Sequence, residues 1–413
     1  MMRYEKAIDW LYGTQLFGIK LGLENTERLL REWRLPAEGQ RLIHVAGTNG
    51  KGSVCAMVDS ICRAGGYRTG LFTSPHLVSY RERIRVNFEM IGEREAARLL
   101  SELRELVTGW KSHPTFFELT TVLAMRYFAE QECEVVVLET GMGGRLDATT
   151  GVIARAVSAG LGGGSSVSVV TRIGMDHEQW LGDTIEKISH EKAGIMREGV
   201  PVVSARQAEE AELILEARAE EVGTEIEFID DIYERGALGL SGRHQRENAA
   251  LARAAIGRSG LVLSDGVVDE GLANVRWRGR FERVGARLVL DGVHNPEATR
   301  ALVETWREEF GDERAIVFFG AVESKDVGGM VSSLAEIASV FHVVTVGTAR
   351  GIEAEALVEV MRGLTEVPCV VGQDLEEAFV PAEETLVLVT GSLFLVGECL
   401  GMLEGREFER SLQ

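Results

Sequence analysis

Short runs of β-branched and aliphatic residues recur along the chain, and stretches with helical periodicity separate them. This alternation is typical of a mostly parallel sheet that is covered by helices on both faces. We expect the strands at residues 41–46, 134–139, 167–173, 287–291, 315–320, 341–346 and 385–390. The stretch after Gly52 has the spacing of one buried helix face at Val54, Met57, Val58, Ile61 and Cys62.

A glycine-rich turn follows the first expected strand and opens the next helix. It reads HVAGTNGKGS over 44–53, so the turn and helix start contain Gly47, Thr48, Asn49, Gly50, Lys51, Gly52 and Ser53. Glycines let backbone amides face phosphate oxygens, the helix start adds partial positive charge, and Lys51 adds a full charge. The Ser53 hydroxyl suits a magnesium ion, although Gly52 intervenes between it and Lys51, unlike the common GxxxxGK[ST] loop. The alternative is a glycine-rich turn with a surface lysine.

The 413 residues are enough for two hydrophobic cores. A polar, glycine-containing stretch near 275–285 precedes a new strand–turn–helix pattern that starts at Arg287. We therefore expect an α/β protein of two domains. Residues 1–277 would form an N-terminal P-loop ATPase-type domain with a doubly wound sheet, and residues 278–413 a smaller, C-terminal Rossmann-like α/β domain.

The acidic balance of the chain limits its partners. It contains 44 Lys and Arg against 64 Asp and Glu, a net charge of −20, which repels nucleic acid and anionic membranes. No apolar run reaches the roughly 20 residues that span a bilayer. The N-terminus lacks the apolar core of a signal peptide, and the five cysteines form no CxxC pair. We expect a cytoplasmic protein that binds neither nucleic acid nor membranes.

Acidic residues and histidines stand where expected strands end. Glu139 ends an apolar strand, where a carboxylate that faces a phosphate loop suits magnesium, and the alternative is a solvated strand end. Asp176 and His177 lie in an expected exposed turn, although a lone histidine is more often structural. Asp291 ends the first strand of the second domain, a position typical of ligand binding in open sheets, and a capped turn is the alternative.

Three arginines alternate in YRERIRV at positions 81, 83 and 85. In an extended segment Arg81, Arg83 and Arg85 would lie on one face, as a candidate site for an anion. The alternative is a solvated basic edge.

The phosphate loop GTNGKGS resembles that of the Mur ligase superfamily. Within it, the chain resembles the folylpolyglutamate synthase/dihydrofolate synthase family over nearly its whole length. The further motifs occur in the family's order: TSPHLVSYRERIRV (73–86), FFELTT (116–121), LETGMGGRLDAT (138–149), GMDHEQWLGDT (174–184), EKAGI (191–195), GRHQRENAALA (242–252), GRFERV (279–284), LDGVHNP (290–296) and TGSLFL (390–395).

The resemblance implies roles for the residues in these motifs. The implied metal ligands, besides Ser53, are Ser74, Glu139 and His177, and His177 is also a candidate catalytic residue with Lys51. Histidine is an unusual ligand for a hard ion such as magnesium. The implied nucleotide contacts outside the loop are Asn248, Arg280 and Asp291. The implied substrate contacts are His76, Arg83, Glu118, Asp176 and His294, with Arg83 pairing with a substrate carboxylate.

Lys192 lies on an expected helix, four residues after Ile188, and leans toward the buried face. A lysine in this position usually extends its ammonium group to solvent. The segment EKAGI resembles the family segment that bears a carbamylated lysine. The resemblance therefore implies that Lys192 is catalytic and carbamylated, since burial lowers the pKa of an amine and a neutral amine takes up carbon dioxide.

Two stretches depart from the family pattern. The chain has LDATT at 146–150 where the family reads LDATN. It also has an insert, Gly160–Ser166, which resembles the phosphate loop of GHMP-type kinases. The run VSVV follows that insert instead of a helix, so we expect a flexible loop that binds nothing.

The resemblance implies an ATP- and Mg²⁺-dependent ligase that activates a carboxylate as an acyl phosphate. The amine of L-glutamate would attack it and release ADP and phosphate. The implied acids are tetrahydrofolate and dihydropteroate, and Trp180 in DHEQWLG is typical of members that accept both. The implied protein is a monomer. The alternatives are a ligase of the same fold for another acid, a nucleotide-dependent regulator without ligase chemistry, and a small-molecule kinase.

Overall fold

The computed structural model describes residues 1–17, 22–160, 166–372, 375–376, 385–406 and 408–409. Its contacts divide the chain into two compact units. The N-terminal unit contains Met1–Ser74, Arg81–Gly239 and Arg246–Val275, and the C-terminal unit contains Pro75–Tyr80, Leu240–Gln245 and Arg276–Gln413. Most of the Gly160–Ser166 insert, residues 161–165, lies outside the described residues.

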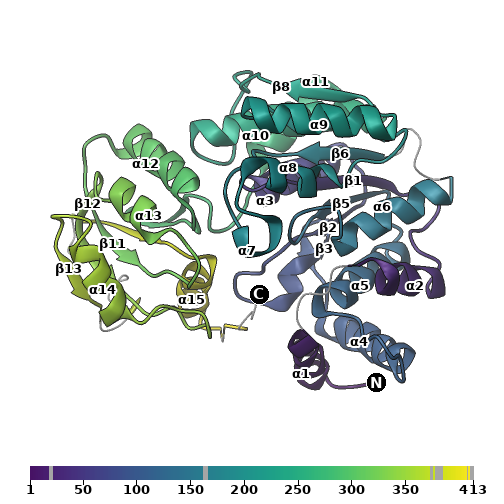
Figure 1. Cartoon of the computed structure of the whole chain (residues 1–413), viewed down its shortest axis with the longest axis horizontal. Helices are drawn as coiled ribbons and strands as arrows, with labels where there is room; N and C mark the ends of the chain where they lie inside the picture. Colours follow the sequence, from purple (N-terminus) through teal and green to yellow (C-terminus); the bar gives the residue numbers. More distant parts are fainter. Residues whose placement is uncertain (18–21, 161–165, 373–374, 377–384, 407, 410–413) are drawn as a thin grey trace. The chain divides into compact units, whose positions relative to one another are not determined.

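The sheet of the N-terminal unit has the strand order β4-β3-β2-β5-β1-β6-β7-β8. Its strands are parallel except β3, which runs antiparallel to β2 and β4. The central strand β1 pairs with β5 and β6 (Figure 1). The strands are β1 (Arg41–Ala46), β2 (Thr69–Phe72), β3 (Ile84–Val86), β4 (Glu89–Met90), β5 (Val135–Glu139), β6 (Ser166–Val170), β7 (Val202–Ala205) and β8 (Ile226–Ile229).

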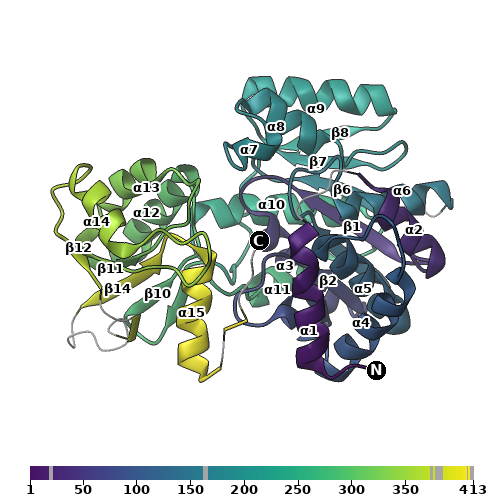
Figure 2. The ribbon, with the colours of Figure 1, turned by 60° about the horizontal axis from the view of Figure 1, so that its bottom comes forward.

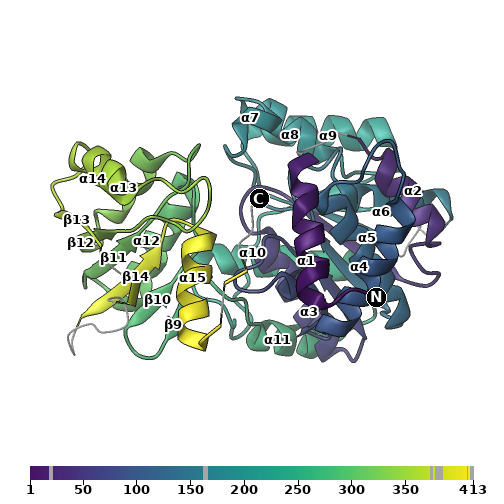
Figure 3. The same cartoon turned by 90° about the horizontal axis from the view of Figure 1, so that it is seen from below.

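Helices cover both sides of this sheet (Figure 1). Helix α3 packs on β1, β2 and β5 beside α11, and α1, α4, α5 and α6 lie side by side (Figure 3). The helices are α1 (Tyr4–Gly13), α2 (Glu24–Glu32), α3 (Lys51–Ala64), α4 (Glu93–Val107), α5 (Phe116–Glu130), α6 (Ala148–Ser158), α7 (Glu178–Leu181), α8 (Ile185–Ala193), α9 (Glu209–Val222), α10 (Arg243–Arg258) and α11 (Asp265–Asn274), with 3₁₀ turns η1 (Thr14–Phe17) and η2 (Tyr80–Arg83).

The sheet of the C-terminal unit has the order β13-β12-β11-β14-β10-β9, and among its described strands only β9 is antiparallel to its neighbour. Helices α12, α13 and α14 lie on one side and α15 on the other (Figure 2). The elements are β9 (Glu282–Val284), β10 (Leu288–Leu290), α12 (Pro296–Phe310), β11 (Ala315–Phe319), α13 (Val327–Leu334), β12 (Ala338–Val343), α14 (Ala354–Arg362), β13 (Cys369–Val371), β14 (Leu386–Thr390) and α15 (Leu393–Glu404).

Strand β14 shows how one strand contributes to two cores. Leu386 and Leu388 belong to the apolar cluster under α12–α14, whereas Val387 and Val389 belong to the cluster under α15. Successive side chains of a strand point to opposite faces, so a fully apolar run is required at this position. The expected α/β class is confirmed for both sheets, and each of the expected strands is present.

The segment Pro75–Tyr80 groups with the C-terminal unit by its contacts, although the sequence-based division placed it in the N-terminal domain. Leu77 and Val78 join the apolar cluster under α15, which gives the physical reason. The segment Leu240–Gln245 groups in the same way. None of the helices in the described part of the chain combines the length and the apolar character needed to cross a membrane.

Candidate functional site

The glycine-rich turn joins the carboxyl end of β1 to the start of α3. The backbone amides of Thr48 and Asn49 donate to the carbonyl oxygen of Arg172, at 2.9 and 3.2 Å. Contrary to the expectation that the amides of the turn face phosphate, these two are therefore used within the protein. At the helix start, Val54 N donates to Gly50 O, so the amides before Val54 have no partner inside the helix. This helix start is the part of the loop that can bind an anion.

Two glycines of the loop cannot be replaced without a local change. Gly47 has φ +146° and Gly50 has φ +91°, both in the region that side chains disfavour. A Cβ atom at Gly47 would lie 1.9 Å from Thr171 Oγ1, and one at Gly50 would lie 2.6 Å from Asn248 Oδ1. The structure thus places Asn248, on α10, directly beside the loop. Thr171 also lies beside the loop, although no sequence pattern had indicated it.

Two lysines converge on the loop. Lys51 Nζ donates to the carbonyl oxygens of Gly47 and Thr48, at 3.1 and 3.2 Å. Lys192 Nζ donates to the same Gly47 carbonyl at 2.7 Å, from α8. Lys192 is only 3% exposed, so its side chain does not extend to solvent as a lysine in this position usually does.

Burial, and to a smaller extent the positive charge of Lys51, lowers the pKa of Lys192 to about 7. The carboxylates of Asp176 and Asp147 oppose this change. Near neutral pH a substantial fraction of Lys192 is therefore an uncharged amine, the form that reacts as a nucleophile.

A serine hydroxyl and a carboxylate near the loop have the chemistry of magnesium ligands. Ser53 is 1% exposed, and its hydroxyl has no hydrogen-bond partner among the described residues. Glu139 is buried at the end of β5, and its carboxylate accepts from Ser74 N at 3.0 Å. The described residues hold no group of three or more His, Cys, Asp or Glu that could bind a metal. Mg²⁺ fits such a sparse set, because it is usually bound by one or two carboxylates, substrate phosphates and water.

Asp176 and His177 lie at the start of α7. His177 has φ +53° and is largely exposed, and its Nε2 lies 3.8 Å from Asp176 Oδ2. The Asp176 carboxylate also accepts from His177 N at 2.9 Å. Trp180, in the same helix, is 50% exposed. Asp176 and His177 thus lie in a turn, as expected, and the short helix α7 follows directly after it.

Behind the loop lies a series of buried, hydrogen-bonded polar side chains that was not identified from the sequence. His44 Nε2 lies 2.7 Å from Thr149 Oγ1, which donates to Asp147 Oδ1 at 2.5 Å. Asp147 Oδ2 accepts from the amides of Gly141 and Met142, at 2.9 and 3.1 Å. Burial lowers the pKa of His44 to about 3, so this imidazole is neutral. The position of Asp147 before a helical pattern was the available signal, since aspartate is a common helix cap.

The expectation that three arginines share one face of an extended segment is wrong. Residues 80–83 form the 3₁₀ turn η2, and only Arg85 lies in a strand. Tyr80 and Arg83 are both fully buried, and a 3₁₀ turn superimposes residues three apart. The Arg83 guanidinium lies 5.2 Å from the centre of the Phe116 ring, whereas Arg81 approaches Glu93.

Glu118 is buried near the start of α5. Its Oε2 accepts from Thr115 N at 2.7 Å, and its backbone amide donates to Thr115 Oγ1 at 3.3 Å, which together form a capping box. Its Oε1 lies 3.5 Å from Thr26 Oγ1. The structure therefore gives this carboxylate a role in starting the helix.

In the C-terminal unit, Asp291 follows β10 and is buried. Its carboxylate accepts from Phe281 N at 2.8 Å and from Val293 N at 3.0 Å. Burial raises the pKa of Asp291, and Arg280 opposes the rise. His294 Nδ1 lies 3.2 Å from Gly292 O.

The next residues start α12. Asn295 caps the helix by accepting from Ala298 N at 2.9 Å, with Pro296 at its first position. The capped turn considered from the sequence is therefore present. His76, also in the C-terminal unit, is buried, and its Nε2 lies 2.8 Å from Glu409 O.

Comparisons with known proteins support these observations. Residues 279–393 match the family described as "Mur ligase, glutamate ligase domain". The dihydrofolate synthase/folylpolyglutamate synthase of Bacillus subtilis is 33% identical, over 96% of this chain and 98% of that protein. The chain is also similar to the structure of Escherichia coli FolC in complex with DHPP and ADP (30% identity, TM-score 0.83, 97% and 98% of the two chains).

A further similar structure is the bifunctional folylpolyglutamate synthase/dihydrofolate synthase of Yersinia pestis complexed with AMPPNP and Mn ion. Its sequence is 29% identical, the TM-score is 0.84, and 98% of each chain is covered. Identity and coverage of this extent establish descent as well as fold. The chain belongs to the dihydrofolate synthase/folylpolyglutamate synthase family.

Proposed function

We propose that this chain is an ATP-dependent ligase that joins L-glutamate to the carboxylate of a folate, and that it accepts both tetrahydrofolate and dihydropteroate. The observation that carries the proposal is the loop at Gly47, where two lysines meet one carbonyl beside a helix start. The relatives support the same activity, because they are named for both synthase reactions and their structures hold ADP, DHPP, AMPPNP and Mn.

In this proposal the start of α3 and Lys51 hold the phosphates of ATP. Lys51 would leave the carbonyls of Gly47 and Thr48 to contact the γ-phosphate and stabilise the charge that develops during transfer to the acid. Asn248 stands beside the loop as a nucleotide contact. In the C-terminal unit, Arg280 and Asp291 are further nucleotide contacts.

Mg²⁺, when bound, would neutralise phosphate charge. The Ser53 hydroxyl and the Glu139 carboxylate would hold it, because both are buried oxygen ligands and the hydroxyl has no other partner among the described residues. Ser74, whose amide donates to Glu139, and His177 would complete a second metal position.

The substrate contacts in this proposal are His76, Arg83, Glu118, Asp176 and His294. The acid must be activated because an oxide is a very poor leaving group. Transfer of the γ-phosphoryl group to the acid gives an acyl phosphate, and the amine of glutamate displaces phosphate from it to form the amide.

We also propose that Lys192 is carbamylated. Its low pKa and burial favour reaction with carbon dioxide, and the resulting anion would orient the metal or the substrate amine. Lys192→Ala should lose most of the activity, and acetate should partly restore it by filling the vacated anion position. Lys192→Arg should be no better than Lys192→Ala. Full activity of Lys192→Arg, with no added carboxyl group in the intact mass, would refute the carbamate.

The decisive test of the function offers dihydropteroate and tetrahydrofolate separately, each with ATP and labelled glutamate, and identifies the products by mass. We expect labelled amides from both acids and glutamate-dependent release of phosphate. A phosphorylated final product would indicate a kinase instead, and phosphate release without any dependence on glutamate would indicate a nucleotide-dependent regulator. Inertness toward both acids would indicate a ligase for another acid.

A further inference from the structure

The last described residues of the chain bind to the segment Pro75–Tyr80, which belongs to the same compact unit. Glu409 N donates to Val78 O at 2.9 Å, and Glu409 O lies 2.8 Å from His76 Nε2. These two contacts involve the backbone of Glu409, and they place its side chain beside the end of the segment.

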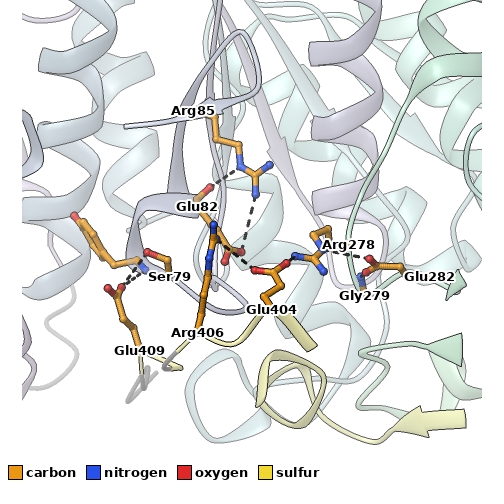
Figure 4. A network of polar contacts seen from close by, with 10 residues as sticks. Ser79, Glu82, Arg85, Arg278, Gly279, Glu282, Glu404, Arg406 and Glu409 are labelled. Atoms are coloured by element: carbon orange, nitrogen blue, oxygen red, sulfur yellow. Dashed lines mark hydrogen bonds and ion pairs between the residues drawn. The ribbon is translucent and has the colours of Figure 1, made fainter. Parts of the chain in front are cut away.

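The Glu409 carboxylate makes two further contacts with the segment. Ser79 Oγ donates to Glu409 Oε2 at 3.2 Å, and Tyr80 N donates to the same oxygen (Figure 4). Hydrogen bonds to an ionised carboxylate are about twice as strong as bonds between neutral groups. The backbone and side chain of Glu409 therefore contact four of the six residues of the segment, which are His76, Val78, Ser79 and Tyr80.

The described residues between α15 and Glu409 make contacts of their own. Helix α15 ends at Glu404 and is capped by Gly405, which has φ +62°, and Arg406 N donates to Gly401 O at 2.9 Å. Glu404, in the last turn of α15, pairs with both Arg406 and Arg278 (Figure 4). Phe408 packs against the apolar cluster that contains Leu77 and Val78.

Contacts with neighbouring parts of the C-terminal unit hold the segment in its conformation. Residues 75–79 form neither helix nor strand, so their backbone depends on contacts with neighbours. One such contact is very close, because a Cβ atom at Gly397 of α15 would lie 2.1 Å from Leu77 O. Glu409 binds the other end of the segment, at Ser79 and Tyr80.

We propose that Glu409 is a positioning residue for substrate binding, which acts by holding Pro75–Tyr80 in its binding conformation. The inference rests on the proposed function, in which His76 contacts the substrate and the preceding Ser74 lies at the metal. Glu409 itself acts through Ser79 and Tyr80.

The test compares Glu409→Ala and Glu409→Gln with wild-type protein. Glu359→Ala serves as a matched control, because Glu359 is an exposed glutamate on α14 of the same unit. For Glu409→Ala we expect the KM of the folate acid to rise about tenfold, the effect of one hydrogen bond to a charged group, with kcat within about twofold. The KM of ATP should stay unchanged. Glu409→Gln keeps an oxygen acceptor and should recover most of the affinity.

A second measurement reports on the contact without the reaction. Hydrogen exchange of the peptide that covers Tyr80 should be faster in Glu409→Ala than in wild type, and unchanged in Glu359→Ala. Faster exchange with an unchanged KM for the acid would refute the positioning role, and unchanged exchange would refute the contact itself. A lower KM would also refute it, since Glu409 would then compete with a substrate carboxylate. If wild-type protein ligated glutamate to no folate, the proposed function would fail, while the exchange measurement would still decide whether Glu409 holds the segment.

Discussion

Replacing Gly50 by alanine tests the geometry of the phosphate loop more directly than replacing any charged residue. Gly50 caps α3 with φ +91°, and an added Cβ would lie 2.6 Å from Asn248 Oδ1. The substitution therefore has two costs. A left-handed backbone costs an L-residue about 1–2 kcal/mol, and the short contact forces Asn248 to move or the loop to shift.

A matched control separates these costs. Gly39 has φ +83°, close to that of Gly50, but nothing lies within 4 Å of its Cβ position. Gly39→Ala should therefore lose only the backbone cost, about 1–2 kcal/mol of the free energy of unfolding. Gly50→Ala should lose more. The loss beyond the backbone cost should disappear when Gly50→Ala is introduced into a protein that already carries Asn248→Ala and is compared with Asn248→Ala alone, because the contact is then absent.

Thermal unfolding and nucleotide titration together provide the assay. In a unit of this size, 1 kcal/mol corresponds to about 2–4 °C in Tm, so the difference from the control is measurable. We also expect Gly50→Ala, but not Gly39→Ala, to bind nucleotide at least about tenfold more weakly, which corresponds to about 1.4 kcal/mol. If Gly50→Ala were as stable as Gly39→Ala and bound nucleotide like wild type, the loop geometry described above would not limit this position.

Three further predictions concern the side chains around the loop. Lys51→Ala should leave the protein folded but abolish turnover, and normal nucleotide affinity and rate in this variant would contradict the assignment of the phosphate loop. Ser53→Ala should leave the unfolding temperature unchanged or raise it, because it removes a buried hydroxyl that has no partner among the described residues. The same substitution should weaken Mg²⁺-dependent nucleotide binding, measured by titrations at varied Mg²⁺ concentration. In buffer free of carbon dioxide, the free energy of unfolding of wild type should rise between pH 7 and about 10 relative to that of Lys192→Met, by at most about 1.4 kcal/mol per pH unit. The reason is that the unfolded chain binds the lysine proton in this range and the folded chain does not. Parallel stability profiles of the two proteins would contradict the low pKa of Lys192.

Most of the strands predicted from the sequence are continuous apolar runs that are buried on both faces, although β2 and β7 are buried in the same way and were not predicted. Residues 135–139 are all buried, and a continuous apolar run of this kind is visible in the sequence. The strands β3, β4 and β9 have only two or three residues and lie toward sheet edges, so they show too little periodicity to be recognised. Strand β8 has four residues, none of them buried, and its pairing with β7 defines it as a strand.

The candidate site was predictable where one local segment determines it. The loop at 47–53 is such a segment, because strand, glycines and helix are contiguous. The arginines of η2 were not predictable in the same way, since the burial of Tyr80 and Arg83 selects a 3₁₀ turn over an extended chain. Contacts such as Glu409 with Ser79 join residues 330 positions apart, and no local pattern encodes them.

Buried polar side chains around the site fall into two groups, and the difference affects how mutants should be interpreted. Glu118 and Asp291 each accept hydrogen bonds from backbone amides that start a helix or hold a turn. Removing either carboxylate leaves buried donors without partners, which costs stability whether or not the carboxylate contacts a ligand. The hydroxyl of Ser53 has no partner among the described residues, so its removal takes nothing from the protein itself. Loss of activity at Glu118 or Asp291 therefore does not by itself identify a ligand contact, whereas loss of activity at Ser53 with unchanged stability does.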